Sequence, residues 1–433
     1  MNMDRFELDT LFYIMETMSS DRKWRVSNPN PCQPGSSWPG IECKPGNDNR
    51  LHVSRLDFGT TPNPTCKKTA TFPIQIFNLP YLQSVFFFNC FKHTKTTVSI
   101  PPQTSHKSNT SLQQFSLRSN TALVGPIPPE ISTLKSLQIL TLSQNRLHGK
   151  IPVEICSLSS LIHLDLSYNF LTGSIPGQIG NLRNLVGLDF SYNSLTGTIP
   201  AGMGQMALLQ KLDLSSNTLV GGVPDSLENL SLLVFIALSN NRLKGKFPKG
   251  LGKLQSLQNF IMDDNPMFMP LPADFGKLAK LQELRLANSG YWGAIPASFS
   301  QLSNLSSLCL QNNELSGAIP FGFRNLSHIY HLNLSRNQLG GVVPFDAGFL
   351  RRLGRNLDLS GNPGLCLNRS EGVEAGLKLG VGVCGINSNS SGNRPGSLSL
   401  PLKKSRASSV ICSTVGNLVG FVCVWGLLYE RLF

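Results

Sequence analysis

The sequence holds one literal match to a phosphate-binding motif. Gly380, Gly382 and Gly385 have Gly-x-Gly-x-x-Gly spacing, which cradles a pyrophosphate when the loop links a strand to a helix. Here the motif contains Cys384 and no helical pattern follows it, so we interpret it as a chance match. Kinase loops, a Gly-x-Ser-x-Gly elbow, paired catalytic carboxylates and metal-ligand spacings are also missing from the sequence. The chain is therefore predicted to be no enzyme, with no cofactor and no metal.

The ten cysteines are the second group with recognisable chemistry. We expect three disulfides, formed by Cys32 with Cys43, Cys66 with Cys90, and Cys366 with Cys384. The first and last pairs flank the repetitive part of the chain, where each closed loop would stabilise an end by about 3 kcal/mol. Disulfides persist in oxidising compartments, which indicates a secreted or cell-surface protein. Cys309 is interpreted as a free thiol or a tolerated small residue, and Cys156 is unassigned.

Three carboxylates recur at one spacing. Asp165, Asp189 and Asp213 are 24 residues apart, each within a short alternating apolar segment. If these segments are adjacent strands about 4.8 Å apart, the carboxylates stack and repel one another. The stack then favours a basic partner, or hydrogen bonds to neighbouring Ser and Tyr hydroxyls. The simpler interpretation is that Leu-Asp-Leu-Ser is a sequence that recurs widely in such repeats, without a binding role.

Other side chains on the same predicted face extend this candidate interface. Phe235 and Ile261 are apolar and are expected to face outward, one and two coils after Asp213. Acidic residues and Arg285 flank them, which suits a docked peptide or a second repeat domain. The full candidate interface comprises Asp165, Tyr168, Asp189, Tyr192, Asp213, Phe235, Ile261 and Arg285.

A 24-residue repeat positions all of these residues. Its clearest mark is an asparagine column, at Asn145, Asn169, Asn193, Asn217, Asn241, Asn265, Asn313 and Asn337. Ser289 takes one slot, and steps of 25 residues lead to Asn120 and Asn362. Around each slot the frame Leu-x-x-Leu-x-Leu-x-x-Asn-x-Leu returns, which is the leucine-rich-repeat pattern. We expect each Asn amide to hydrogen-bond the backbone of adjacent coils and so form a ladder.

The second half of each repeat reads Leu-x-Gly-x-Ile-Pro, as at Leu171 to Pro176. Ten slots follow this pattern, and nine keep the glycine. This form resembles the plant-type extracellular leucine-rich repeat. The exception is the segment from Met267 to Pro272, where Met269 replaces glycine. Its loop must be re-routed, either as a tolerated irregularity or as a functional kink with an exposed apolar patch.

We therefore predict an α/β fold, a leucine-rich-repeat solenoid with plant-type coils, disulfide-capped ends and a C-terminal membrane segment. The predicted parts are an N-terminal cap (1–50), the repeats (51–365), a C-terminal cap (366–386), a disordered stalk (387–409) and a transmembrane segment (410–428). Leu8, Leu11, Met15 and Met18 share a face of a predicted N-terminal helix that would cover the first coil. No secretory signal is recognisable at the start, so we expect one to precede the given sequence. A lipid anchor near Ser390 is the alternative to the transmembrane segment.

Composition and charge limit the classes of binding partner that the sequence favours. The chain of 433 residues is 40% hydrophobic and 15% charged, with a net charge of +13. Lys and Arg are scattered over the repeats and do not form a run with aromatics, so no nucleic-acid partner is predicted. An acidic polysaccharide or acidic protein surface is the more natural counterpart. Glycosylation is predicted at the sequons of Asn109, Asn229, Asn304, Asn325, Asn368 and Asn389, whereas a glycan on Asn333 would obstruct the predicted concave face.

The segment before the repeats carries a family resemblance. Trp24 and the stretch from Pro31 through Trp38 to Cys43 resemble the N-terminal cap of plant receptor-like proteins of the TOO MANY MOUTHS and Piriformospora indica-insensitive type. The closing segment from Leu357 to Cys366 agrees with this resemblance. It implies an extracellular repeat domain, a membrane attachment, no kinase, and signalling through a receptor kinase that also carries repeats.

The leading functional hypothesis is therefore a cell-surface receptor-like protein at the plasma membrane, with its repeat domain extracellular. Its expected partners are a peptide ligand or a receptor kinase with leucine-rich repeats. The alternative is an apoplastic inhibitor resembling polygalacturonase-inhibiting proteins, which share the capped repeat but are soluble. A wall-associated scaffold held by its basic charge is a third class.

Overall fold

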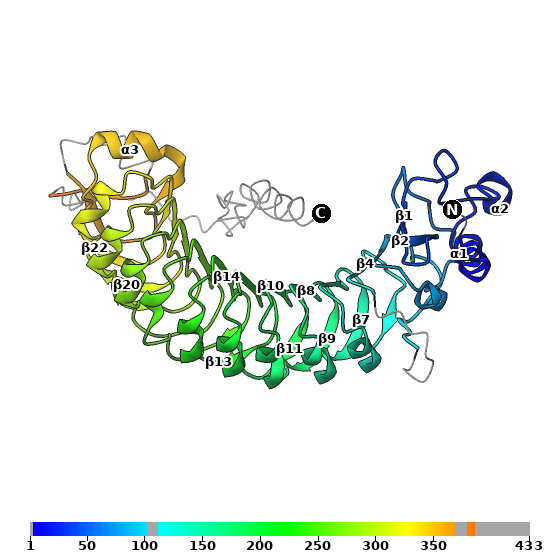
Figure 1. The fold of residues 1–433 in the computed structure, drawn as a ribbon. Helices are drawn as coiled ribbons and strands as arrows, with labels where there is room; N and C mark the ends of the chain where they lie inside the picture. The colour runs from blue at the N-terminus through cyan, green and yellow to red at the C-terminus, as the bar shows by residue number, and fades with distance from the viewer. Residues whose placement is uncertain (1–2, 102–110, 369–378, 386–433) are drawn as a thin grey trace, which may run out of the picture.

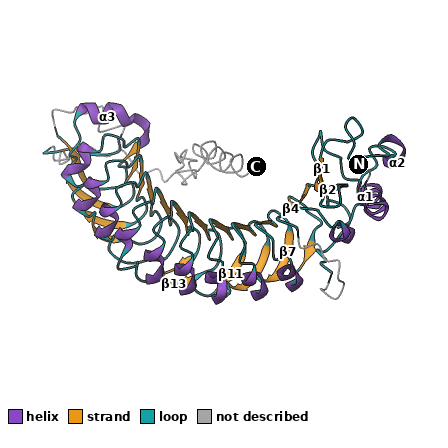
Figure 2. Ribbon diagram, viewed as in Figure 1, coloured by secondary structure: helices purple, strands orange, loops and turns teal. Residues whose placement is uncertain are grey.

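The computed structural model describes residues 3–101, 111–368 and 379–385 as a curved solenoid (Figure 1). A long sheet lines the inside of the arc, and short helical turns follow its outer side (Figure 2). Between them lies one continuous apolar core, built from the repeated Leu, Ile and Phe positions. The predicted leucine-rich-repeat solenoid is confirmed by this arrangement.

The inner sheet has 14 strands, one from almost every coil. In spatial order the strands are β1 (Ile41–Pro45), β2 (Leu51–Phe58), β3 (Ser84–Phe88), β4 (Gln114–Arg118), β6 (Ile139–Thr141), β8 (His163–Asp165), β10 (Gly187–Asp189), β12 (Lys211–Asp213), β14 (Phe235–Ala237), β16 (Asn259–Ile261), β17 (Glu283–Arg285), β19 (Ser307–Cys309), β21 (His331–Asn333) and β23 (Leu357–Asp358). Only β1 runs antiparallel to its neighbour, and β8, β10 and β12 pair in register. Equivalent residues of successive coils therefore form straight columns on the inner face.

The outer half of most coils contains a short strand and then a 3-10 helix. The strands are β5 (Val124–Gly125), β7 (Arg146–Lys150), β9 (Phe170–Ser174), β11 (Ser194–Thr196), β13 (Val220–Gly221), β15 (Arg242–Leu243), β18 (Trp292–Ala294), β20 (Glu314–Gly317), β22 (Gln338–Val342), β24 (Gly364–Leu367) and β25 (Gly382–Val383). The helices are η1 (Ile74–Asn78), η2 (Pro129–Thr133), η3 (Val153–Ser157), η4 (Gly177–Asn181), η5 (Ala201–Gln205), η6 (Asp225–Asn229), η7 (Leu251–Lys253), η8 (Ala273–Lys277), η9 (Ala297–Gln301), η10 (Phe321–Asn325) and η11 (Gly354–Asn356). A proline directly precedes most of these turns, because it has no N–H that would need a partner there.

The asparagine ladder is present as predicted. The side chain of Asn169 accepts a hydrogen bond from the Leu147 N–H at 3.1 Å and donates to the Leu142 carbonyl at 2.8 Å, both in the preceding coil. It also donates to the Leu166 carbonyl of its own coil. Each amide thus satisfies backbone groups that the sharp turn after the strand would otherwise leave buried without partners.

The coil with Met269 departs from this regularity. At the equivalent glycines the backbone φ is positive, as at Gly221 (78°) and Gly293 (79°), a conformation that Met269 does not adopt. The left-handed step moves to Phe268, with φ of 45°. The outer strands are consequently interrupted between β15 and β18, where a single bridge joins Pro270 to Trp292. The predicted re-routing is confirmed.

Helix α1 (Arg5–Met18) closes the N-terminal end. Leu11, Met15 and Met18 are fully buried against the first coils, as predicted. Glu7 is buried as well and contacts His52 of β2, with its Oε2 2.6 Å from the ring Nδ1. The other ring nitrogen lies 2.9 Å from Asp48. Helix α2 (Trp24–Ser27) places the Trp24 ring edge-on to Trp38.

Disulfides join the expected cysteines at both ends. The pairs are Cys32–Cys43, Cys66–Cys90 and Cys366–Cys384. Helix α3 (Ala347–Leu353) covers the last coils, and its own side chains Phe349 and Leu353 are buried. Cys309 is also disulfide-bonded, so interpreting it as a free thiol or a tolerated small residue was wrong. The 24-residue pattern carries no information about which cysteine would approach this strand.

Some predictions concern residues outside the described ranges. These are the sequons of Asn109 and Asn389, the stalk (387–409) and the transmembrane segment (410–428). Among the described residues, every helix is too short or too polar to cross a bilayer.

Candidate functional site on the concave face

Two columns of side chains face the inside of the arc. The entry column consists of the first residues of the three-residue strands, including Ile139, His163, Gly187, Lys211 and Phe235. The exit column consists of their third residues, including Thr141, Asp165, Asp189, Asp213 and Ala237. Strand pairing aligns each residue with its counterpart in the next coil, for example Asp165 with Asp189 and Asp189 with Asp213.

Each aspartate of the exit column is held by a serine of its own coil. The hydroxyl and the N–H of Ser167 both donate to Asp165 Oδ1, at 2.7 and 3.0 Å. Ser191 and Ser215 bind Asp189 and Asp213 in the same way. Of the interpretations weighed from the sequence, hydrogen bonding to neighbouring serines is thus confirmed.

The chain also supplies a basic partner for the stack. Lys211 reaches from the entry column to Asp189, with an Nζ to Oδ2 distance of 2.8 Å. Burial and the charge of Asp189 nevertheless raise the pKa of Asp213 to about 6, against the opposing effect of Lys211. The pKa of Asp165 is raised by burial and by Asp189. Burial and nearby Lys211 lower the pKa of His163 to about 4, so this ring is neutral at physiological pH.

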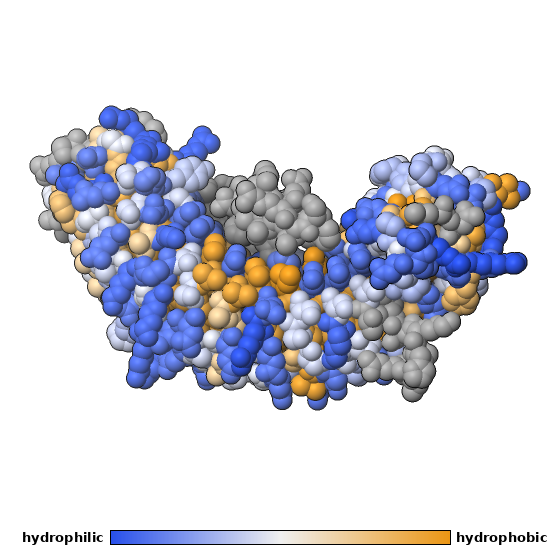
Figure 3. Space-filling model, in the orientation of Figure 1, coloured by the Kyte–Doolittle hydropathy of each residue, from blue (hydrophilic) through white to orange (hydrophobic). Residues whose placement is uncertain are grey.

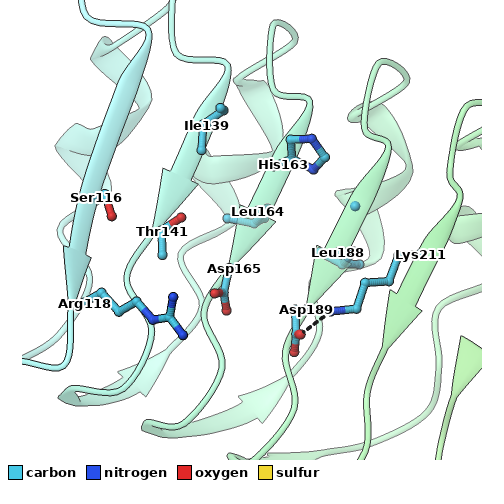
Figure 4. Close-up of a pocket in the computed structure, with 11 residues that line it drawn as sticks. Ser116, Arg118, Ile139, Thr141, His163, Leu164, Asp165, Leu188, Asp189 and Lys211 are labelled. Atoms are coloured by element: carbon cyan, nitrogen blue, oxygen red, sulfur yellow. Dashed lines mark hydrogen bonds and ion pairs between the residues drawn. The ribbon is translucent and has the colours of Figure 1, made fainter. Parts of the chain in front are cut away.

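His163, Asp165, Asp189 and Lys211 line a pocket of about 230 Å³, and Asp213 lies beside it in the next coil (Figure 4). Arg118, at the end of β4, reaches across the floor toward Asp165, while Asp189 and Lys211 lie at the other side. Arg118 is exposed, and within the described residues its guanidinium forms no ion pair. The pocket therefore offers an available cation beside a carboxylate stack that is only partly neutralised.

Tyr168 and Tyr192 lie just beyond the exit column. Their rings stack with centroids 4.2 Å apart, and each side chain is about half exposed, at 47% and 48%. Both residues have positive φ, which fixes the backbone at the turn after each strand. Burial and the neighbouring Tyr192 raise the pKa of Tyr168 to about 12, so its hydroxyl stays protonated. The pair forms a rigid aromatic surface beside the pocket.

The other predicted interface residues lie further along the arc. Phe235 is partly exposed, but Ile261 is only 8% exposed, so the prediction that Ile261 offers an apolar contact was wrong. Arg285, which pairs with Ile261 on the neighbouring strand, reaches back to Asp263 at 2.7 Å. Arg285 itself keeps 15% of its side chain exposed. The structure thus brings together Asp165, Asp189, Asp213 and the tyrosines, and leaves Ile261 and Arg285 outside the pocket.

Sequence reasoning missed Arg118 and Lys211. Only the exit column was read from the repeat, whereas Lys211 belongs to the entry column and Arg118 ends a longer strand. Reading the first strand position at the same 24-residue step would have placed Lys211 beside the aspartates. Among the sequons, Asn229, Asn304, Asn325 and Asn368 are exposed, whereas Asn333 is buried and accepts a hydrogen bond from Ser335.

Comparison with known families agrees with the fold. Models described as leucine rich repeat match residues 136–158, 159–219 and 279–339. Three proteins of Arabidopsis thaliana are similar in sequence. Receptor like protein 29 is 66% identical over 145 residues, which is 34% of this chain and 31% of that protein. Protein TOO MANY MOUTHS is 38% identical over 138 residues, or 31% of this chain and 26% of that protein. Piriformospora indica-insensitive protein 2 is 33% identical over 150 residues, or 33% of this chain and 34% of that protein.

The match therefore spans about a third or less of each of these relatives. Among solved structures, the complex PEPR1-AtPEP1 is 27% identical with a TM-score of 0.69, covering 84% of this chain and 49% of that one. The peptide hormone receptor RGFR1 in complex with RGF2 is 26% identical with a TM-score of 0.62, covering 76% and 61%. The resemblance noted in the sequence is confirmed: the chain is a leucine-rich-repeat protein related to plant receptor-like proteins.

Proposed function

We propose that this protein is a cell-surface receptor-like protein that binds an extracellular peptide, or the ectodomain of a receptor kinase, through its concave face. Its repeats lie outside the plasma membrane, and the protein acts by binding without catalysis. The three disulfides among the described residues support an oxidising compartment. Membrane attachment through residues 410–428 remains part of the proposal.

One observation carries the binding role. The concave face places an exposed Arg118, a partly neutralised carboxylate stack and, beside the pocket, two stacked and half-exposed tyrosines along five neighbouring coils. Charged groups beside rigid aromatic surface are typical of protein recognition sites, in which a few aromatic and Arg residues dominate the binding energy. Figure 3 shows in addition an apolar patch on the inner rim of the arc near β10 and β14. One similar structure is that of a plant peptide hormone receptor, RGFR1, in complex with RGF2.

The test is a binding measurement with the secreted protein. Immobilised protein is exposed to synthetic extracellular peptides, beginning with AtPEP1 and RGF2, and to receptor-kinase ectodomains. For any ligand found, Arg118→Glu and the double variant Tyr168→Ser/Tyr192→Ser are each expected to weaken binding about tenfold or more. These side chains are exposed, so their replacement leaves the core intact.

Matched controls lie off the concave face. Arg146→Glu makes the same charge change as Arg118→Glu, and Phe170→Ser removes a 58% exposed ring from β9. Both controls are expected to bind as the unchanged protein does. Binding that tolerates both concave variants, or that the control variants weaken equally, would refute the concave face as the binding surface.

The location needs its own measurement. Full-length protein with an internal tag is expected to be glycosidase-sensitive and to fractionate with the plasma membrane. A soluble, unglycosylated product would contradict the receptor proposal.

A further inference from the structure

A second surface, away from the concave face, displays two immobilised aromatic rings. Phe268 is 66% exposed and Trp292 is 48% exposed, and the Trp292 indole N–H donates to the Phe268 carbonyl at 3.2 Å. The Phe268 ring lies directly over Gly290, where a Cβ would come within 2.4 Å of its Cδ1. With its only polar group already bonded, Trp292 presents an apolar face, as Phe268 does. We call the two rings the aromatic platform.

Cations gather in the coil that precedes the platform. Arg242, Lys244, Lys246 and Lys249 are all exposed within eight residues that contain no acidic side chain. Lys244, Phe268 and Trp292 follow one another at the 24-residue step, so they occupy equivalent places in successive coils. Within the described part of the chain, the side chains of Arg242, Lys244 and Lys246 form no ion pair. This coil therefore carries a local positive patch, although the Lys and Arg residues of the whole chain are scattered.

These two features together specify a ligand chemistry. Unpaired lysines are flexible point charges that accept carboxylates in many orientations. Exposed flat rings gain free energy when another apolar face covers them. A polyuronate offers both, because each sugar ring has an apolar C–H face and carries a carboxylate. An acidic peptide would match the charges but does not offer regularly repeated flat faces.

We infer that the edge formed by Arg242, Lys244, Lys246, Phe268 and Trp292 binds an acidic polysaccharide of the polyuronate class. The carboxylates pair with the cations, and a sugar ring stacks on the aromatic platform. The concave stack of Asp165, Asp189 and Asp213 has the opposite charge and would repel the same ligand. This site is therefore independent of the proposed concave binding surface, and either can fail without the other.

The test uses the full chain and immobilised polygalacturonate. Binding is expected to weaken as salt rises, because exposed charges are screened. The double variant Lys244→Glu/Lys246→Glu is expected to reduce affinity about tenfold or more, and Phe268→Asn about fivefold. Asn tolerates the positive φ of residue 268, so this variant removes the ring without straining the loop. The matched controls are Lys92→Glu/Lys95→Glu, on two exposed lysines of a distant coil, and Phe170→Ser.

Two further ligands separate the site from general charge attraction. Poly-L-glutamate of similar length is expected to bind more weakly and to be indifferent to Phe268→Asn, and a neutral glucan is expected not to bind. Equal binding of poly-L-glutamate together with no effect of Phe268→Asn would overturn the proposal in favour of an acidic peptide. Equal loss in the Lys92→Glu/Lys95→Glu variant would overturn it in favour of the net charge of the whole protein.

Discussion

The coils around Asn217 and the coil that begins at Asn265 solve the same turn in different ways. In the regular coils, the N–H two residues after each Asn bonds to the next Asn side chain, as Leu195 does to Asn217 at 3.0 Å. At the irregular coil the next side chain is Ser289, which is too short for this contact. Met267 and Phe268 instead donate to the Ser289 carbonyl, at 3.0 and 3.2 Å. The backbone has taken over a bond that a side chain makes elsewhere.

This difference shows where the solenoid depends on side chains. In regular coils the backbone path is standard and one amide satisfies several buried groups. In the irregular coil the path has changed, so the side chain at the slot matters less. This changed path places Phe268 in a left-handed conformation and interrupts the outer strands, and both changes lower stability.

The largest expected effect concerns the ladder itself. Asn217→Ala removes bonds to the Leu195 N–H and to the carbonyls of Phe190 and Leu214, and should lower the free energy of unfolding by about 3 kcal/mol. Ser289→Ala should cost about 1 kcal/mol, because the Met267 N–H keeps its carbonyl partner. Denaturant unfolding measures both, with exposed Thr196→Ala as a neutral control. Equal losses of unfolding free energy in Asn217→Ala and Ser289→Ala would contradict the proposed difference between the regular and the irregular coil.

A second prediction exchanges one buried carboxylate in each region for an amide. Asp213 has its pKa raised to about 6 by burial and by Asp189, whereas the pKa of Asp263 is raised by burial against the charge of Arg285. At pH 7 Asp213→Asn should be neutral or stabilising, since Asn333 shows that an amide oxygen can accept the same serine bonds. Asp263→Asn should destabilise by about 2 kcal/mol, because the largely buried Arg285 loses its closer carboxylate partner and keeps only Glu283 at 4.0 Å.

The raised pKa of Asp213 also predicts how stability depends on pH. Because the folded state raises the pKa of Asp213 above its unfolded value near 4, the folded state binds this proton more tightly. The stabilisation from the proton is complete below about pH 4 and is lost as pH rises through about 6, with a total of about 3 kcal/mol. Unfolding measured across this range should show a decline that Asp213→Asn removes. An unchanged pH profile in the variant would assign the decline to other groups.

The smallest expected effects concern the left-handed residues. Gly221→Ala should cost about 1 kcal/mol, because φ there is 78° and the new Cβ would lie 3.0 Å from Thr198. Phe268→Asn should instead stabilise by roughly 0.5 kcal/mol, since Asn adopts this conformation more readily and the lost ring is mostly exposed. Thermal unfolding of the two variants shows whether each substitution raises or lowers the stability of the protein. A loss of stability in Phe268→Asn would mean that ring packing outweighs backbone strain.

Much of the fold could be predicted from the sequence because the repeat is redundant. Asn169 and its equivalents predict the ladder, and the spacing of Leu11, Met15 and Met18 predicts the capping helix. Errors arose where a side chain reaches between coils. Arg285 reaches Asp263 from the next strand, and Lys211 reaches Asp189. Both contacts join residues 22 positions apart and depend on rotamers, not on the repeat. The left-handed conformation falls on Phe268 in the coil where Met267 and Phe268 donate to the Ser289 carbonyl, and no single residue type in the sequence predicts this hydrogen bonding.

The interruption between β15 and β18 also has a mechanical meaning. The inner sheet continues through this coil, whereas on the outer side the bridge from Pro270 to Trp292 joins the coil to β18. A first interruption lies between β11 and β13, which are joined by the bridge from Thr198 to Val220. A load that straightens the arc stretches its inner side, and a load that closes the arc stretches its outer side. The outer side is therefore expected to yield first between β11 and β18, where its strand pairing is interrupted twice. Single-molecule force measurements with handles on the two caps should find the softest closing motion there.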